Sequence, residues 1–88
     1  MYSKEITICN PTGLHARPAS MLVSNASKYE STITLKRVGT EDEYNVKSIV
    51  MLLACGLSQG EKAVLAAEGS DEEQAVTELA AFIENLSE

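Results

Sequence analysis

The spacing of apolar residues predicts four β-strands along the chain. Over residues 2–9 apolar and polar side chains alternate, with Tyr2, Ile6 and Ile8 on one face, as in a strand with one buried side. Three further strand segments are predicted at residues 32–36, 43–46 and 62–68. The second and third of the four follow each other across an acidic turn, which indicates a β-hairpin.

Three other segments have the pattern of helices. Residues 16–27 carry apolar or small side chains at the spacing of one helix face, and residues 48–55 form a short apolar helix. A last helix is predicted after Ser70, where Ser70 and Glu73 have the spacing of a capping box. The order βαββαβα indicates an α+β fold, with an antiparallel sheet and helices on one face.

The first of these helices has an unusual start. Pro18 falls in its first turn, where a proline is well tolerated, and His15 directly precedes it. Helices normally begin after Ser, Thr, Asp or Asn, whose side chains accept hydrogen bonds from first-turn amides. His15 replaces such a residue, so we expect the amides of Ala16 and Arg17 to be available to an anion.

His15 is the one histidine of the chain, and its surroundings suit phosphoryl chemistry. The first-turn amides, the positive end of the helix dipole and the Arg17 guanidinium converge on its imidazole. These positive surroundings suit an anionic phosphoryl group, so we expect the ring to act as its nucleophile. A lone histidine is more often an ordinary surface or core residue, and only its joint spacing with Arg17 and the helix start indicates a phosphohistidine carrier.

Composition limits the alternatives. The 88 residues predict one domain, residues 1–88, too small for a deep substrate cleft. A net charge of −6 argues against nucleic acid or an anionic membrane surface as partner. The start of the chain lacks the pattern of a signal peptide, and no apolar run approaches the roughly 20 residues that span a bilayer. We therefore expect a cytoplasmic protein without membrane insertion.

Neither the acidic clusters nor the cysteines predict a metal or a cofactor. The carboxylates at 41–43 and 71–73 are expected on the solvated surface, in a hairpin turn and at a helix start. Cys9 and Cys55 form no CxxC pair and have no second histidine to complete a zinc site. Both are expected to pack as small apolar residues in a reducing compartment.

The apolar segment 49–55 is the second candidate functional region. A helix of about two turns buries only one face in a two-layer domain, so part of this segment must be exposed. Ser48 directly precedes it and is expected to be its N-cap.

Residues 13–20, Gly-Leu-His-Ala-Arg-Pro-Ala-Ser, resemble the active-site signature of HPr, the histidine-containing phosphocarrier family of the bacterial phosphoenolpyruvate-dependent sugar phosphotransferase system. The resemblance continues through 26–29, 46–49, Gly56 and the last helix. It implies an open-faced two-layer sandwich with strand order 1-4-2-3. It also implies that His15 lies at an exposed edge next to the second helix.

The resemblance further implies that His15 accepts phosphate from enzyme I and donates it to the IIA domains of sugar permeases, while Arg17 neutralises the transferring group. Ser48 matches the site that a bifunctional HPr kinase/phosphorylase modifies in relatives from low-GC Gram-positive bacteria, in connection with a catabolite-control transcription factor. The expected protein is a monomer. Its expected docking residues are Ser20, Ile49, Val50 and Leu53, with Leu52 in the core.

Two departures and several alternatives accompany this interpretation. Met51 stands where relatives often have a small or polar residue, and segment 37–42 is two residues longer than the common Gram-positive form. His15 excludes a regulatory paralogue that lacks the active histidine, but a nitrogen-system phosphocarrier stays open. So does a purely regulatory binding module acting through Ser48 and the apolar segment. An independent phosphatase or mutase would need a second general acid, which the sequence does not offer.

Overall fold

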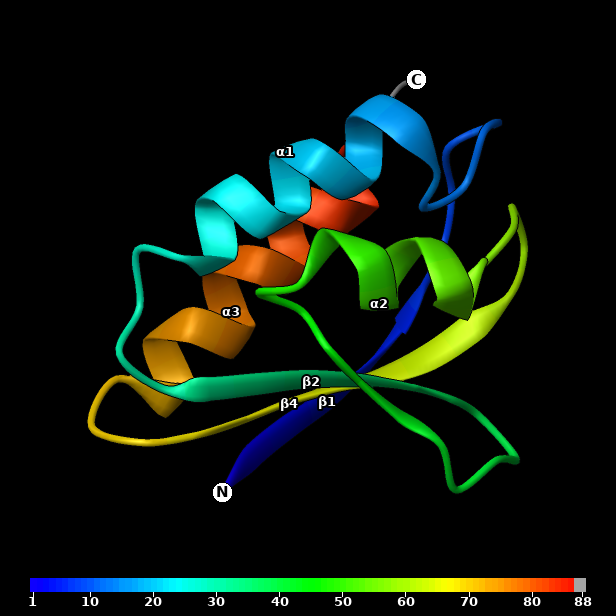
Figure 1. The fold of residues 1–88 in the computed structure, drawn as a ribbon. Coiled ribbons are helices and arrows are strands. Elements are labelled where there is room, and N and C mark those ends of the chain that lie inside the picture. Colours follow the sequence, from blue (N-terminus) through cyan, green and yellow to red (C-terminus); the bar gives the residue numbers. More distant parts are fainter. Residues whose placement is uncertain (87–88) are drawn as a thin grey trace.

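The computed structural model describes residues 1–86, and within them strands and helices follow one another in the predicted order (Figure 1). The elements are β1 (Tyr2–Thr7), α1 (Ala16–Ala26), β2 (Thr32–Arg37), β3 (Glu43–Asn45), α2 (Ile49–Cys55), β4 (Lys62–Glu68) and α3 (Glu72–Glu84). None of the helices in these residues is long and apolar enough to cross a membrane.

The strands form one antiparallel sheet in the order β1-β4-β2-β3, which confirms the expected topology. Central strand β4 pairs Ala63 with Ile6 of β1 and Leu65 with Leu35 of β2, so apolar side chains align on one face. All three helices lie on that side of the sheet (Figure 1). Helix α3 packs on β1 and β4, α2 lies near β3, and α1 contacts both other helices.

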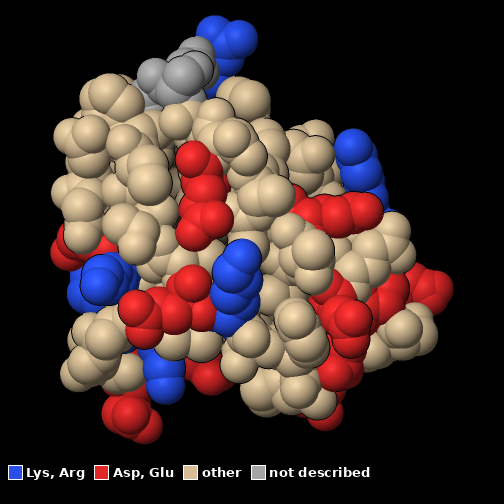
Figure 2. Space-filling model, turned by 180° about the vertical axis from the view of Figure 1, so that it is seen from behind, with Lys and Arg blue, Asp and Glu red and all other residues tan. Residues whose placement is uncertain are grey.

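The core lies between the sheet and the helices. Alternate residues of the strands and one face of each helix are buried there, as the spacing predicted. The largest of these side chains are Ile6, Ile8, Leu14, Leu22, Ile33, Leu35, Leu52, Leu57, Leu65, Leu79, Ile83 and Val46. On the face seen in Figure 2, Lys and Arg side chains lie singly among acidic ones, without a continuous basic patch.

The start of α3 differs from the prediction. Asp71, not Ser70, is its N-cap residue, so the predicted capping box of Ser70 and Glu73 is wrong. The Asp71 carboxylate does not cap the helix but accepts hydrogen bonds from the Glu30 amide at 2.9 Å and the Ser31 amide at 3.0 Å. A tertiary contact with the loop before β2 therefore replaces the local cap.

Two expectations about the first strand also need correction. Strand β1 ends at Thr7 rather than at residue 9, and Tyr2 at its start is 38% exposed. Cys9 is exposed rather than packed as a small apolar residue, because it lies beyond the strand, outside the core. Cys55 is buried as expected, and both thiols are free.

Candidate functional site

A tight turn leads the chain from β1 to the site. Asn10 is buried, and its side-chain amide donates to the Gly13 carbonyl at 2.8 Å, while the Gly13 amide donates to the Asn10 carbonyl at 3.2 Å. Gly13 has φ +67°, and a Cβ atom there would lie 2.3 Å from the Leu57 carbonyl oxygen. The turn therefore requires glycine at this position, both for its backbone conformation and for the close approach of residue 57.

His15 lies directly after this turn, as the exposed N-cap residue of α1. Its backbone is extended, with φ −122° and ψ 159°, and its side chain makes no capping hydrogen bond. The first turn of α1, with Ala16 and Arg17, contains no acidic residue. Pro18 has no amide proton, so these two residues supply the first-turn donors of α1.

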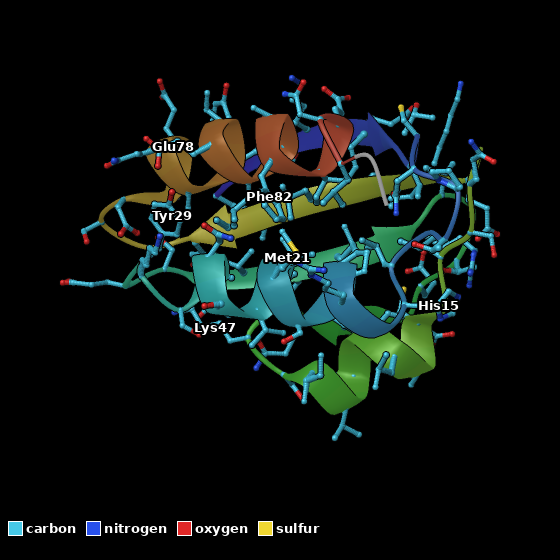
Figure 3. All side chains as sticks on the ribbon, turned by 90° about the horizontal axis from the view of Figure 1, so that it is seen from above. His15, Met21, Tyr29, Lys47, Glu78 and Phe82 are labelled. Carbon is cyan, nitrogen blue, oxygen red and sulfur yellow. The ribbon has the colours of Figure 1, made fainter. Side chains whose placement is uncertain are left out.

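The imidazole of His15 lies against the end of α2. Gly56, the left-handed C-cap residue of α2, leaves only 3.6 Å between an ideal Cβ position and His15 Cε1. Figure 3 shows His15 where the start of α1 meets the end of α2. The ring is thus placed between the positive end of one helix and the negative end of another.

Arg17 is exposed in the first turn of α1 and lines an open hollow of about 510 Å³ between α1 and α3. Met21, Glu78, Phe82 and Leu86 also line it. Figure 3 shows Met21 and Phe82 between the two helices. Arg17, which was predicted to serve His15, therefore borders the end of α3.

At the other end of α2, Ser48 is the N-cap residue, as predicted. Its Oγ accepts a hydrogen bond from the Met51 amide at 3.3 Å. The preceding residue, Lys47, donates from Nζ to the Tyr29 carbonyl at 2.6 Å, which ties the start of α2 to the end of α1. The hydroxyl of Ser48 is half-buried and oriented by the helix it caps.

Comparison with known proteins gives a consistent result. Residues 2–85 match the family described as "PTS HPr component phosphorylation site". Phosphocarrier protein HPr of Borreliella burgdorferi is 43% identical over 88 residues, which are the whole of both chains. The chain belongs to the HPr family of phosphocarrier proteins.

Solved structures of relatives agree with this fold. An HPr from Thermoanaerobacter tengcongensis has a TM-score of 0.89 and 44% identity, and the match covers 96% of this chain and 92% of that one. Crh of Bacillus subtilis, described as a catabolite repression protein and a domain-swapped dimer, has a TM-score of 0.76 and 33% identity over 100% and 99% of the chains.

Helix α2 exposes several apolar side chains. Val50 is 73% exposed, Leu53 45% and Ile49 37%, whereas Leu52 is fully buried, as predicted. Met51 is also exposed. Ser20 is exposed on α1, which contacts α2. The predicted docking residues are therefore accessible on two neighbouring helices.

Sequence reasoning missed the residues that hold the site together. No role was predicted for the buried Asn10, although Asn side chains often hydrogen-bond the backbone of a turn two or three residues on. Arg37 and Glu61, 24 residues apart, form an ion pair at the end of α2, and no local sequence pattern predicts it.

Burial raises the pKa of the neighbouring Cys55 thiol, which favours its protonated form. Within residues 1–86, no cluster of three or more His, Cys, Asp or Glu side chains suits a metal ion.

Proposed function

We propose that His15 carries a phosphoryl group from phosphorylated enzyme I to the IIA domains of sugar permeases. The observation that carries this proposal is the exposed His15 imidazole at a helix start without a side-chain cap, in an HPr-family chain. A ring nitrogen attacks phosphorus, a P–N bond forms, and the bond between phosphorus and enzyme I breaks. The second transfer reverses these roles, with the IIA domain as acceptor.

Two groups stabilise the transferring phosphoryl group in this proposal. The amides of Ala16 and Arg17, in the first turn of α1, are the proposed donors to its oxygens. The Arg17 guanidinium neutralises the negative charge that passes between the partners. Transfer between exposed groups needs no deep pocket, which agrees with the size of the chain.

The test is phosphorylation with phosphoenolpyruvate and catalytic enzyme I, followed by intact-mass measurement. One acid-labile phosphate is expected, and addition of a IIA domain should remove it. His15→Ala should take up none, and Arg17→Ala should slow transfer about 10- to 100-fold with an unchanged thermal melt. Label that survives His15→Ala, or that is stable to acid, contradicts the proposal.

The docking surface in this proposal is formed by Ser20, Ile49, Val50 and Leu53, which are exposed on α1 and α2, the two helices that meet at His15. Contiguous exposed apolar side chains of this kind are typical of protein-binding surfaces. In this proposal the carrier is a cytoplasmic protein of one domain. It acts as a monomer, because each transfer requires this surface to be open. The Crh dimer is a property of that relative.

Phosphorylation of Ser48 is the proposed regulatory step, with an HPr kinase/phosphorylase as the modifying enzyme and a catabolite-control transcription factor as a further partner. Ser48 caps α2 directly before the exposed Ile49 and Val50, so a phosphate there adds negative charge beside the docking surface. The effect is electrostatic and leaves the fold unchanged.

Incubation with ATP and a Gram-positive HPr kinase tests this step. An acid-stable phosphate on Ser48 is expected from peptide mapping, and Ser48→Ala should abolish it. Ser48→Asp should slow phosphorylation of His15 by enzyme I. Modification at another serine, or none at all, contradicts the regulatory proposal. If His15 is inert while Ser48 is modified, the purely regulatory alternative replaces the carrier function.

A further inference from the structure

Arg37, the last residue of β2, donates hydrogen bonds to the end of helix α2. Its Nη2 atom lies 3.1 Å from the Cys55 carbonyl oxygen and 3.4 Å from the Gly56 carbonyl oxygen. The last carbonyls of a helix have no amide donors inside it, and no basic residue lies in the last turn of α2. Arg37 supplies these donors from a neighbouring strand.

Glu61 holds the guanidinium in this position. Its two carboxylate oxygens accept from Arg37 Nε and Nη2, each at 3.2 Å, and Oε2 also accepts from the Ser58 amide at 2.6 Å. Such paired contacts fix the plane of the guanidinium. These hydrogen bonds keep the pKa of the Glu61 carboxyl below its usual range, so the pair stays charged near neutral pH. Residues 56–61 thereby become a braced connection between α2 and β4.

The braced connection touches the His15 segment at two points. The Leu14 amide donates to the Leu57 carbonyl at 2.9 Å, one residue before His15. Gly56, whose carbonyl accepts from Arg37, is also the residue against which the His15 ring lies. A shift of residues 56–57 would therefore move both the backbone before His15 and the surface that its ring contacts.

The same guanidinium also acts on the carbonyls at the end of α2. The carbonyls at the end of α2 carry the negative end of its dipole, which opposes an incoming anionic phosphoryl group. Arg37 donates to two of these carbonyls and so reduces their exposed negative charge, while Glu61 balances the net charge of the guanidinium. Arg37 is exposed by about a third of its side chain, so water screens it only partly.

We infer that Arg37, held by Glu61, is a positioning residue for phosphoryl transfer at His15. It fixes the end of α2 against the imidazole and supplies hydrogen-bond donors to the last carbonyls of that helix. The inference rests on the proposed carrier function of His15. It gives the Arg37–Glu61 pair a role in the rate of transfer rather than in partner docking.

The kinetic test compares Arg37→Gln, Glu61→Gln and Arg37→Lys as acceptors from phosphorylated enzyme I. The first two variants should lower the saturating transfer rate about 5- to 20-fold, with KM within about twofold of the original value. Arg37→Lys should restore part of the rate, because it keeps the charge but loses the paired contact with Glu61. Lys36→Gln is the matched control, with equal charge loss at the preceding residue of β2, and should transfer normally.

The structural readout is the NMR signal of the His15 Cε1 proton in the unphosphorylated protein. It should shift in Arg37→Gln and Glu61→Gln but not in Lys36→Gln, which a role in stability alone would not produce. If Arg37→Gln fails to fold, Glu61→Gln and Arg37→Lys give the same two readouts.

A raised KM with an unchanged saturating rate would make the pair a docking element and overturn the inference. Unchanged rates and an unmoved Cε1 signal would overturn it as well. If the original protein accepts no phosphate at all, the carrier proposal fails instead. In that case the Cε1 signal alone decides whether the pair positions the ring.

Discussion

The N-termini of α1 and α3 lie at opposite ends of the molecule and have opposite chemistry (Figure 1). Helix α1 starts at His15 with no acidic residue in its first turn and no side-chain cap. Helix α3 starts at Asp71 with Glu72 and Glu73 in its first turn, and Glu72 accepts from the Gly69 amide and pairs with the N-terminal ammonium. Within residues 1–86, the protein's own carboxylates thus occupy the start of α3, whereas the first turn of α1 contains no acidic residue.

The contacts behind each helix start differ in the same way. At the α3 end, Asp71 accepts from Glu30 and Ser31, and the Tyr29 hydroxyl donates to Glu78. Burial and the Glu78 carboxylate raise the pKa of Tyr29 to about 12. The polar groups at this end are thus hydrogen-bonded to one another. At the His15 end the bracing comes from backbone contacts and from groups behind the ring, and the His15 side chain is exposed to solvent.

The largest expected effect separates packing from docking on α2. Leu52→Glu places an unpaired carboxylate in the core and should cost about 4 kcal/mol or more, enough to unfold a small domain. Leu53→Glu, one residue away at 45% exposure, should change stability by less than about 0.5 kcal/mol while it weakens binding to enzyme I. Thermal melts and binding titrations measure both effects. A large loss of stability in Leu53→Glu would contradict its assignment to the docking surface, and so would unchanged affinity.

The next effect concerns the turn that presents His15. Gly13→Ala should lower the unfolding free energy by about 2–3 kcal/mol, because it combines a left-handed backbone with a collision at the Leu57 carbonyl. Gly39→Ala is the matched control, since its φ is +91° but no atom lies within 4 Å of the added Cβ, and it should cost about 1 kcal/mol. Urea unfolding of both variants checks this. Equal losses would show that the close approach to residue 57 contributes nothing.

The smallest effect tests the α3 end through its pH dependence. Hydrogen bonds from Ser31 and Glu30 hold the pKa of Asp71 below its usual range. The native state therefore binds fewer protons here than the unfolded state, and this stabilisation is lost as pH falls through the folded pKa. Asp71→Asn should be less stable at neutral pH and should lose less stability in acid. The slope of its unfolding free energy against pH should differ from that of the original protein by at most about one bound proton. If the unfolding free energies of the variant and the original protein fall equally steeply with decreasing pH, this role of Asp71 is contradicted.

Local features and long-range contacts differ in how far the sequence predicted them. At the His15 end the helix without a side-chain cap and the exposed face of α2 follow from local spacing, and the structure agrees. The Arg37–Glu61 pair and the role of Asp71 join residues 24 and 40 positions apart, so they depend on strand order rather than on neighbours in sequence. Local capping rules assigned the start of α3 to Ser70. They failed because the loop before β2 offers Asp71 better partners than the helix does.

The most direct test of the central claim is an amide NMR comparison of the protein before and after phosphorylation with enzyme I and phosphoenolpyruvate. If the phosphoryl group on His15 is held by the clear start of α1, the amide signals of Ala16 and Arg17 should move strongly downfield as they donate to its oxygens. The amides of Glu72 and Glu73 at the occupied start of α3 should not move. Phosphorylation that leaves the Ala16 and Arg17 signals in place, or that shifts both helix starts alike, would contradict the account.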